Sequence, residues 1–218
     1  DADRLGVVDE TGEIIWADQL IALLLPEVIE PGDKIIFDVK CSQALEDMIK
    51  KYKGEPVMWK TGHSLIKNKM AESDCKLGGE MSGHIFFADD YFGYDDAIYV
   101  AARLIQMLSK TDKTLSELKS VIPIYHSTPE IRLEAESDEE KFKIAKLAVE
   151  YFTENHNCNT IDGVRIQYEN GWGLVRASNT QPVIVCRFEG DTPERMNEIK
   201  NIVLDKLQEF GTLNISSH

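Results

Sequence analysis

Residues 33–60, DKIIFDVKCSQALEDMIKKYKGEPVMWK, decide the fold class of the first half of the chain. Residues 34–39 are an apolar run rich in strand-forming side chains, typical of a strand buried on both faces. Ser42 can cap a helix, Gly54 ends that helix, and residues 57–60 form a second short strand. A strand, a helix and a strand in this order predict a βα-layered sheet.

The flanking sequence extends this layer. We expect two strands at 4–9 and 13–16, a helix capped by Asp18, a helix at 64–72, a loop opened by Gly78 and Gly79, a strand at 84–88 and a helix at 95–108. In the last helix the expected buried face carries Ile98, Ala101, Ile105 and Leu108, which recur at helical spacing. The result is an α/β domain with a mixed sheet over residues 17–122.

The pattern changes after Pro123 and Pro129. We expect a strand at 130–136, a helix at 138–155, three strands at 163–168, 173–177 and 183–188, and a helix at 193–210. In the helix at 138–155 the expected buried face carries Phe142, Ala145, Val149 and Phe152. This order predicts an α+β domain over residues 123–218, an antiparallel four-stranded sheet with two helices on one face.

Charge and composition exclude several classes of protein. The 218 residues carry 24 Lys+Arg and 38 Asp+Glu, a net charge of −14, whereas a general nucleic-acid binder needs a basic face. A local phosphate site remains compatible with this charge, because a Debye length of about 8 Å screens distant groups. The longest aliphatic run, residues 20–25, is too short to span a membrane, and no signal peptide is visible, so we expect no membrane partner.

The four cysteines, Cys41, Cys75, Cys158 and Cys186, lie far apart in the sequence and form no CxxC pair. We expect buried free thiols in a reducing compartment, the cytoplasm, and no zinc site.

Two polar clusters offer oxygen ligands and hydroxyl contacts. In Asp1-Ala2-Asp3-Arg4, an extended backbone would turn both carboxylates toward one magnesium ion; the alternative is a solvated acidic terminus. In residues 78–84, Glu80, Ser82 and His84 follow two glycines, and a carboxylate beside a hydroxyl suits sugar hydroxyls; the alternative is an ordinary loop.

Two further clusters offer positive charge. Arg176 begins a loop, residues 176–182, in which an arginine fork and neutral donors can bind phosphate; the alternative is a polar hairpin turn. An arginine kept for a ligand is not a packing element, so we expect its loss to leave stability nearly unchanged. Lys40 and His63 each follow a strand end, where α/β sheets bind ligands; a solvated lysine and a helix-terminal histidine are the alternatives.

Six ordered motifs then resemble one family. They are DADR at 1–4, DVKCS at 38–42, WKTGHSLIK at 59–67, GEMSGH at 79–84, FGYDDAIYVAAR at 92–103 and GWGLVRASNTQP at 171–182. Together they resemble the α-D-phosphohexomutase superfamily, and within it the bacterial phosphomannomutase/phosphoglucomutase family. Phosphoglucosamine mutase is the nearest alternative, and a non-enzymatic phosphosugar-binding module is an alternative of another class.

The resemblance implies a role for each cluster. Asp1 and Asp3 match two of the three aspartates of a magnesium loop, with Arg4 beside them. His84 or His63 would accept a proton, and the phosphosugar substrate would meet residues of all the remaining clusters: Lys40, His63, Glu80, Met81, Ser82, Gly83, His84, Arg176, Ala177, Ser178, Asn179 and Thr180.

The resemblance also implies a longer parent enzyme. Residues 1–16 would be the remnant of a preceding metal-loop domain, and domains 1 and 2, with the phosphorylated serine, would be missing partners. The parent would be an isomerase that interconverts hexose 1-phosphate and hexose 6-phosphate, with magnesium as cofactor and glucose 1,6-bisphosphate as activator. We expect this chain alone to be inactive.

Overall fold

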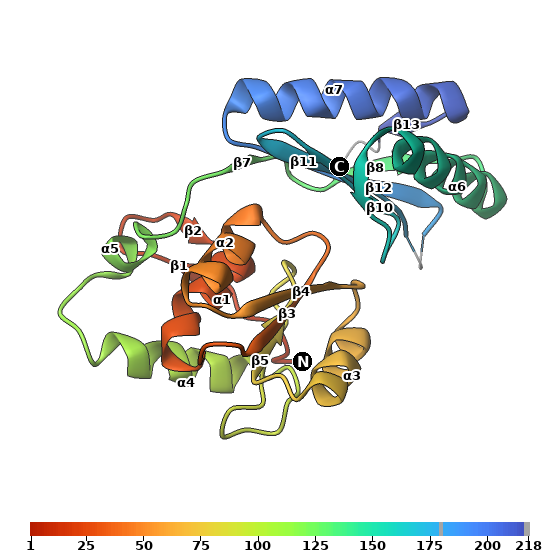
Figure 1. The fold of residues 1–218 in the computed structure, drawn as a ribbon. Helices are drawn as coiled ribbons and strands as arrows, with labels where there is room; N and C mark the ends of the chain where they lie inside the picture. Colours follow the sequence, from red (N-terminus) through yellow and green to blue (C-terminus); the bar gives the residue numbers. More distant parts are fainter. Residues whose placement is uncertain (179–180, 216–218) are drawn as a thin grey trace. The chain divides into compact units, whose positions relative to one another are not determined.

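Residues 1–178 and 181–215 are described in a computed structural model. The chain divides into two compact units, Asp1–Ile124 and Tyr125–His218, each with its own sheet and core (Figure 1). None of the helices among the described residues has the length and apolar character that a membrane crossing requires.

The first unit is an α/β layer. Its strands are β1 (Val7–Val8), β2 (Ile14–Ile15), β3 (Lys34–Asp38), β4 (Glu55–Trp59), β5 (Leu77–Gly79) and β6 (Ile85–Phe87). Its helices are α1 (Ala17–Leu24), the 3-10 turn η1 (Leu25–Glu27), α2 (Gln43–Lys51), α3 (His63–Ser73), α4 (Ala97–Leu108) and α5 (Leu115–Lys119). Four strands form a sheet of order β4-β3-β5-β6, in which β4, β3 and β5 are parallel and β6 is antiparallel to β5, so the predicted mixed sheet is confirmed.

Helices cover both faces of this sheet. A Cβ atom on Gly78 would lie 2.8 Å from the sulfur of Met70 in α3, and one on Gly79 would lie 2.7 Å from Ile21 in α1. Successive strand residues face opposite sides, so α3 packs on one face and α1 on the other. The prediction that these glycines open a loop was wrong: they form β5, where a side chain would not fit.

The second unit is an antiparallel sheet with two helices. Its strands are β7 (His126–Ser127), β8 (Ile131–Glu134), β9 (Asn157–Asn159), β10 (Val164–Tyr168), β11 (Gly171–Ala177), β12 (Val183–Gly190) and β13 (Asn214–Ile215), and its helices are α6 (Asp138–Asn155) and α7 (Pro193–Phe210). The four expected strands pair in the order β8-β12-β11-β10, which confirms the α+β class. Among the described residues the sheet has seven strands, because β7, β9 and β13 extend it.

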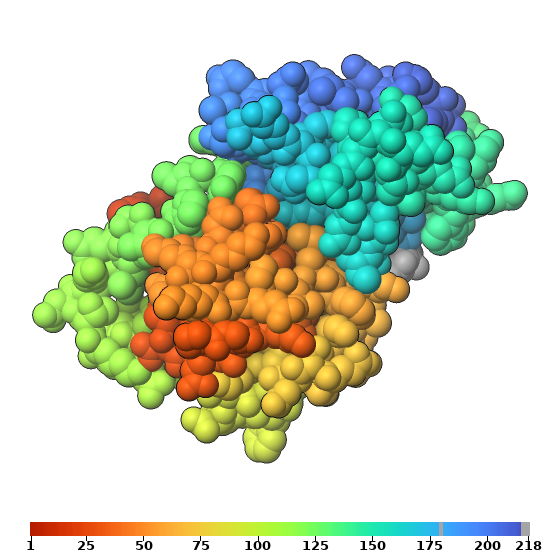
Figure 2. Space-filling model, in the orientation of Figure 1, coloured from red at the N-terminus to blue at the C-terminus, as the bar shows by residue number. Residues whose placement is uncertain are grey.

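Both helices pack on one face of this sheet. The core between them holds Ile144 and Phe152 of α6 and Ile199 and Val203 of α7 against Val175 of β11. Helix α7 forms the long blue outer surface of this unit in the space-filling view (Figure 2).

One local prediction, the Asp18 cap, was wrong, and two predicted helix faces were right only in part. Helix α1 begins at Ala17, and Asp18 lies inside it, where its buried carboxylate accepts hydrogen bonds from the backbone N–H groups of Gln19 (2.9 Å) and Ser42 (2.8 Å). In α4 the expected face is partly solvated: Ile98 is 71% and Ile105 66% exposed, and the buried residues are Ala97, Val100, Leu104 and Met107. In α6 Phe142 is exposed, and the buried residues are Lys141, Ile144, Ala148 and Phe152.

All four cysteines are free thiols in the structure. Cys41, Cys75 and Cys186 are buried as expected, whereas Cys158 is only half-buried.

Candidate functional site

Three loops meet at the carboxyl edge of the first unit's sheet. The parallel strands β3, β4 and β5 end at Asp38, Trp59 and Gly79. Parallel strands present their carboxyl ends at the same edge, which is where open α/β sheets bind ligands. The sequence-predicted residues Lys40, His63 and 80–84 all follow these ends, so the topology brings them together.

Asp38, to which the sequence analysis gave no role, connects these loops. Its fully buried carboxylate accepts hydrogen bonds from Thr61 Oγ1 (3.2 Å), the Met81 backbone N–H (3.3 Å) and Cys41 Sγ (3.1 Å). The buried Lys40 ammonium lies 3.9 Å from the same carboxylate. A buried carboxylate requires such partners, and these come from the loops after all three strands. The sequence feature that could have identified Asp38 is an acidic residue at the end of a buried apolar strand.

Glu80 occupies the tight turn after β5. Its carboxylate, 3% exposed, accepts hydrogen bonds from the Gly62 backbone N–H and from Ser82 Oγ at 3.0 Å. The turn closes through Glu80 N–H to the His84 carbonyl at 2.8 Å and Gly83 N–H to the Glu80 carbonyl at 3.1 Å. Gly83 has φ +105°, in the region that favours glycine. The carboxylate and hydroxyl predicted for sugar contacts are therefore adjacent in space. Met81, which lies between these two residues in the sequence, is half-buried.

A histidine pair shares one carboxylate. His84 is buried, and its Nδ1 lies 2.7 Å from Asp95 Oδ2. The ring of His63 stacks on that of His84 at 5.5 Å between centroids, and its Nδ1 lies 3.8 Å from the same Asp95 oxygen. Asp95 stands just before α4 and bridges to Phe86 of β6. Asp95 lies inside the motif at 92–103, but no sequence pattern indicated its function.

The acidic N-terminal segment joins this cluster in a different way from the one expected. Ala2 has φ +60°, so the segment is not extended, and Asp1 and Asp3 do not follow the geometry on which the shared-cation prediction was based. Asp3 Oδ2 lies 3.9 Å from His84 Nδ1, and single ligand atoms of Asp3, His84 and Asp95 lie within 4.8 Å of one another. Asp1 and Arg4 are exposed.

The second unit holds the predicted phosphate loop between β11 and β12. Arg176 is buried, and its Nε donates to Asp162 Oδ2 at 3.1 Å. The half-buried Ala177 follows, and the buried Ser178 donates its backbone N–H to the Val183 carbonyl at 2.9 Å. Asn179 and Thr180 lie outside the described residues. Arg176 therefore also has a structural partner in Asp162, which the sequence did not predict.

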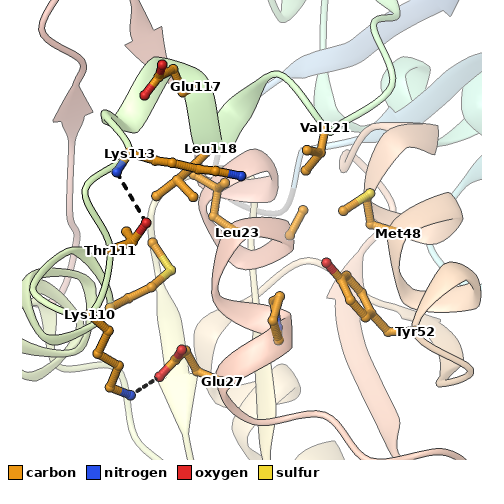
Figure 3. A pocket seen from close by; sticks show the side chains of 13 residues that line it. Leu23, Glu27, Met48, Tyr52, Lys110, Thr111, Lys113, Glu117, Leu118 and Val121 are labelled. Atoms are coloured by element: carbon orange, nitrogen blue, oxygen red, sulfur yellow. Dashed lines mark hydrogen bonds and ion pairs between the residues drawn. The ribbon is translucent and has the colours of Figure 1, made fainter.

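A hollow of about 330 Å³ in the first unit lies apart from these residues. Figure 3 shows Leu23, Met48 and Tyr52 on its walls. Its charged groups include Glu27 and Lys110, which are paired with each other. No sequence-predicted site residue lines the hollow.

Comparison with known proteins identifies both units. Residues 16–125 match phosphoglucomutase/phosphomannomutase, alpha/beta/alpha domain III, and residues 130–206 match the C-terminal domain of the same family. A phosphomannomutase/phosphoglucomutase of Pseudomonas aeruginosa is 49% identical over 210 residues, which are 95% of this chain and 45% of that protein. A phosphoglucomutase of Neisseria meningitidis is 43% identical over 208 residues, 92% of this chain and 44% of that protein.

A solved structure of the same family has the same fold. The crystal structure of a phosphoglucomutase/phosphomannomutase family protein from Burkholderia thailandensis superposes with a TM-score of 0.86 at 38% identity, over 98% of this chain and 46% of that one. An α/β/α unit followed by an antiparallel α+β unit is the arrangement of two consecutive domains of that family. The chain belongs to the phosphoglucomutase/phosphomannomutase family, as the six motifs indicated. It spans about 45% of the length of the curated relatives it matches.

Proposed function

We propose that this chain supplies the sugar and phosphate contacts of a phosphohexomutase that interconverts the 1- and 6-phosphates of glucose and mannose. In such an enzyme a phosphoserine donates its phosphoryl group to the sugar phosphate. The bisphosphorylated sugar, glucose 1,6-bisphosphate in the case of glucose, then reorients, and its other phosphoryl group returns to the serine. The serine would belong to one of the domains that precede these two in the relatives.

The observation that carries this proposal is that the loops after β3, β4 and β5 meet at Asp38, with Glu80 in the last of them. The Glu80 carboxylate and the Ser82 oxygen, 3.0 Å apart, both offer acceptor positions for the hydroxyls of a sugar. A carboxylate oxygen has more than one acceptor position, so Glu80 can keep its Gly62 and Ser82 bonds and accept a sugar hydroxyl. The nearby Lys40 ammonium would favour a phosphorylated ligand.

We assign proton transfer to His84. Because Nδ1 faces the Asp95 carboxylate at 2.7 Å, that nitrogen would carry the proton, and Nε2 would be the acceptor for the attacking hydroxyl. His63, stacked beside it, would be a second basic group facing the substrate. Asp95 acts here as the group that orients the imidazole.

Magnesium fits the acidic segment in donor chemistry, because this cation prefers carboxylate oxygens. Asp1 and Asp3 would hold it, with Arg4 beside them, and Asp3 already lies near His84 and Asp95. When bound, magnesium would offset negative charge on the transferring phosphoryl group. In the second unit Arg176, Ala177 and Ser178, continuing to Asn179 and Thr180, would hold the phosphate that is not reacting.

Sugar binding by the whole 218-residue chain tests the proposal. Titrations with glucose 1-phosphate and mannose 1-phosphate, followed by amide chemical shifts, should give dissociation constants within about threefold of each other, since both sugars differ only at C2 and each supplies the same number of hydrogen bonds elsewhere. Glu80→Gln should weaken both by about tenfold, because charged hydrogen bonds are about twice as strong as neutral ones.

Glu72→Gln is the matched control, since Glu72 is exposed at the end of α3 and its carboxylate lies 3.4 Å from the Lys69 ammonium. It should bind like the wild type. A chain that binds neither sugar phosphate, or a Glu80→Gln variant with unchanged affinity, contradicts the proposed site. Binding of glucosamine 1-phosphate alone would favour a phosphoglucosamine mutase.

A further inference from the structure

A buried ammonium holds the loop that follows Arg176. Lys141 is 2% exposed, and its Nζ donates to the carbonyl of Ser178 (2.9 Å), the carbonyl of Gln181 (2.9 Å) and Asp138 Oδ1 (2.7 Å). An ammonium has three donors, so all three are used. The two carbonyls stand at the two ends of the loop 178–181.

At the position of Lys141, a positive charge lowers the stability of helix α6. Lys141 lies in the first turns of α6, where the helix dipole disfavours a cation. It also occupies the buried face that continues with Ile144, Ala148 and Phe152, where an apolar side chain would avoid the desolvation of a charge. Packing and helix formation therefore do not account for a lysine here, whereas its two bonds to the loop do.

The bonds around the loop show what the lysine fixes. Ser178 N–H donates to the Val183 carbonyl at 2.9 Å and Val183 N–H donates to the Gln181 carbonyl at 2.8 Å, which closes the turn on the strand side. On the side that faces α6, the Lys141 ammonium donates to the carbonyls of Ser178 and Gln181. Ser178 and Gln181 are thus each held both by a backbone bond to Val183 and by the Lys141 ammonium of α6.

We propose that Lys141 is the positioning residue of the phosphate loop, fixing the backbone of Ser178 and Gln181 so that the loop that begins at Arg176 can hold a phosphate group. This inference rests on the proposed phosphate-binding role of that loop. The ammonium acts through the loop backbone, because its three donors are taken by the two carbonyls and by Asp138.

The test compares two lysines of the same helix in the whole chain. Lys141→Met keeps the aliphatic stem and removes the ammonium; Lys146→Met removes an ammonium that is 77% exposed and lies 3.7 Å from Glu150. Inorganic phosphate and glucose 1-phosphate are titrated by amide chemical shifts at a temperature where every variant is folded. Lys141→Met should weaken both ligands by about tenfold or more, and Lys146→Met by less than about twofold.

Hydrogen exchange separates positioning from general stability. In Lys141→Met the Ser178 and Val183 amides should exchange faster, while core amides such as Ile166 and Val203 keep their protection. If Lys141→Met fails to fold, Lys141→Gln, which keeps a neutral donor at a smaller desolvation cost, should give an intermediate loss of affinity.

The outcomes distinguish this inference from the proposed function. Unchanged phosphate affinity in Lys141→Met or Lys141→Gln, with affinity lost in Arg176→Met, overturns the role of Lys141 alone. A wild-type chain that binds neither ligand overturns the phosphate loop, and with it the role of the lysine. Equal losses in Lys141→Met and Lys146→Met would show a general charge effect and also overturn the inference.

Discussion

Replacing Arg176 by methionine should destabilise the second unit, even though this arginine is proposed to bind a ligand. Its Nε–H donates to Asp162 at 3.1 Å, and the two side chains are 9% and 17% exposed. A hydrogen bond between charged groups contributes about 1.5–3 kcal/mol, and breaking a fully buried pair costs about 3–5 kcal/mol. Because neither side chain is fully buried, we expect a loss of about 1.5–3 kcal/mol.

Urea unfolding, followed at a single residue, measures this loss of folding free energy in the second unit. The Trp172 indole N–H is buried and donates to Glu189 Oε1 at 2.7 Å, so its NMR signal reports the folding of this sheet. A double-mutant cycle with Asp162→Ala should return a coupling energy of about 1.5–3 kcal/mol. Lys146→Met is the control, because Lys146 is 77% exposed, lies 3.7 Å from Glu150 on the surface of α6 and should contribute less than about 1 kcal/mol.

Phosphate binding completes the experiment. Arg176→Met should weaken binding of glucose 1-phosphate by about one to two orders of magnitude, and Arg176→Lys should not restore it, because an ammonium cannot reproduce the fork. A coupling energy near zero would refute the pairing with Asp162. A loss of stability with unchanged phosphate affinity would refute the ligand role and leave Arg176 as a structural residue.

Three further predictions concern local structure. Gly83→Ala should cost about 1–3 kcal/mol in thermal unfolding, because φ is +105° and the new Cβ would lie 3.3 Å from Arg4; Gly6→Ala, with nothing within 4 Å, should cost less. The Tyr91 hydroxyl and the Tyr99 and Ile98 amides lower the pKa of Asp96, so its stabilising contribution is present above the unfolded pKa of about 4 and is lost as the pH falls through the lower folded value. Asp96→Asn should therefore narrow the difference in melting temperature between pH 5 and pH 3, and an unchanged difference would contradict this. Burial raises the pKa of Cys75 to about 11 and also raises the pKa values of Cys186 and Cys158, so exposure decides the order and a thiol reagent should label the half-buried Cys158 first; equal labelling rates would be the contrary result.

The positions of elements were predictable where the signal is local. Helix α6 begins after Ser137, whose side chain accepts the Glu140 N–H, and α7 begins after Thr192, which accepts the Arg195 N–H. A cap and the pattern that follows it lie within a few residues, so the sequence contains the whole signal. The buried faces were less predictable. Helix α4 carries apolar residues around most of its circumference, so periodicity fits both the face with Ile98 and the face with Val100, and only the packing against the sheet selects one.

In the candidate site the bases were predictable and their acids were not. Lys40, His84 and Arg176 each lie against a carboxylate, of Asp38, Asp95 and Asp162 respectively. For His84 and Arg176 the acid is 11 and 14 residues away along the chain, so the pair exists only after the strands have paired. A predicted base and its distant acid therefore cannot be matched from sequence spacing alone.

This pairing has a consequence for how an acidic chain can hold a phosphate. A base that already faces a carboxylate adds little net positive potential, but its side chain is held in one orientation and presents donors at fixed positions. Fixed donors lose less conformational entropy when a ligand binds than free lysines and arginines do. The net charge of −14 and the anion site are then compatible, because recognition depends on the direction of hydrogen bonds more than on a long-range field that salt would screen. The acids that accompany the bases are, in this view, as much a part of the binding surface as the bases themselves.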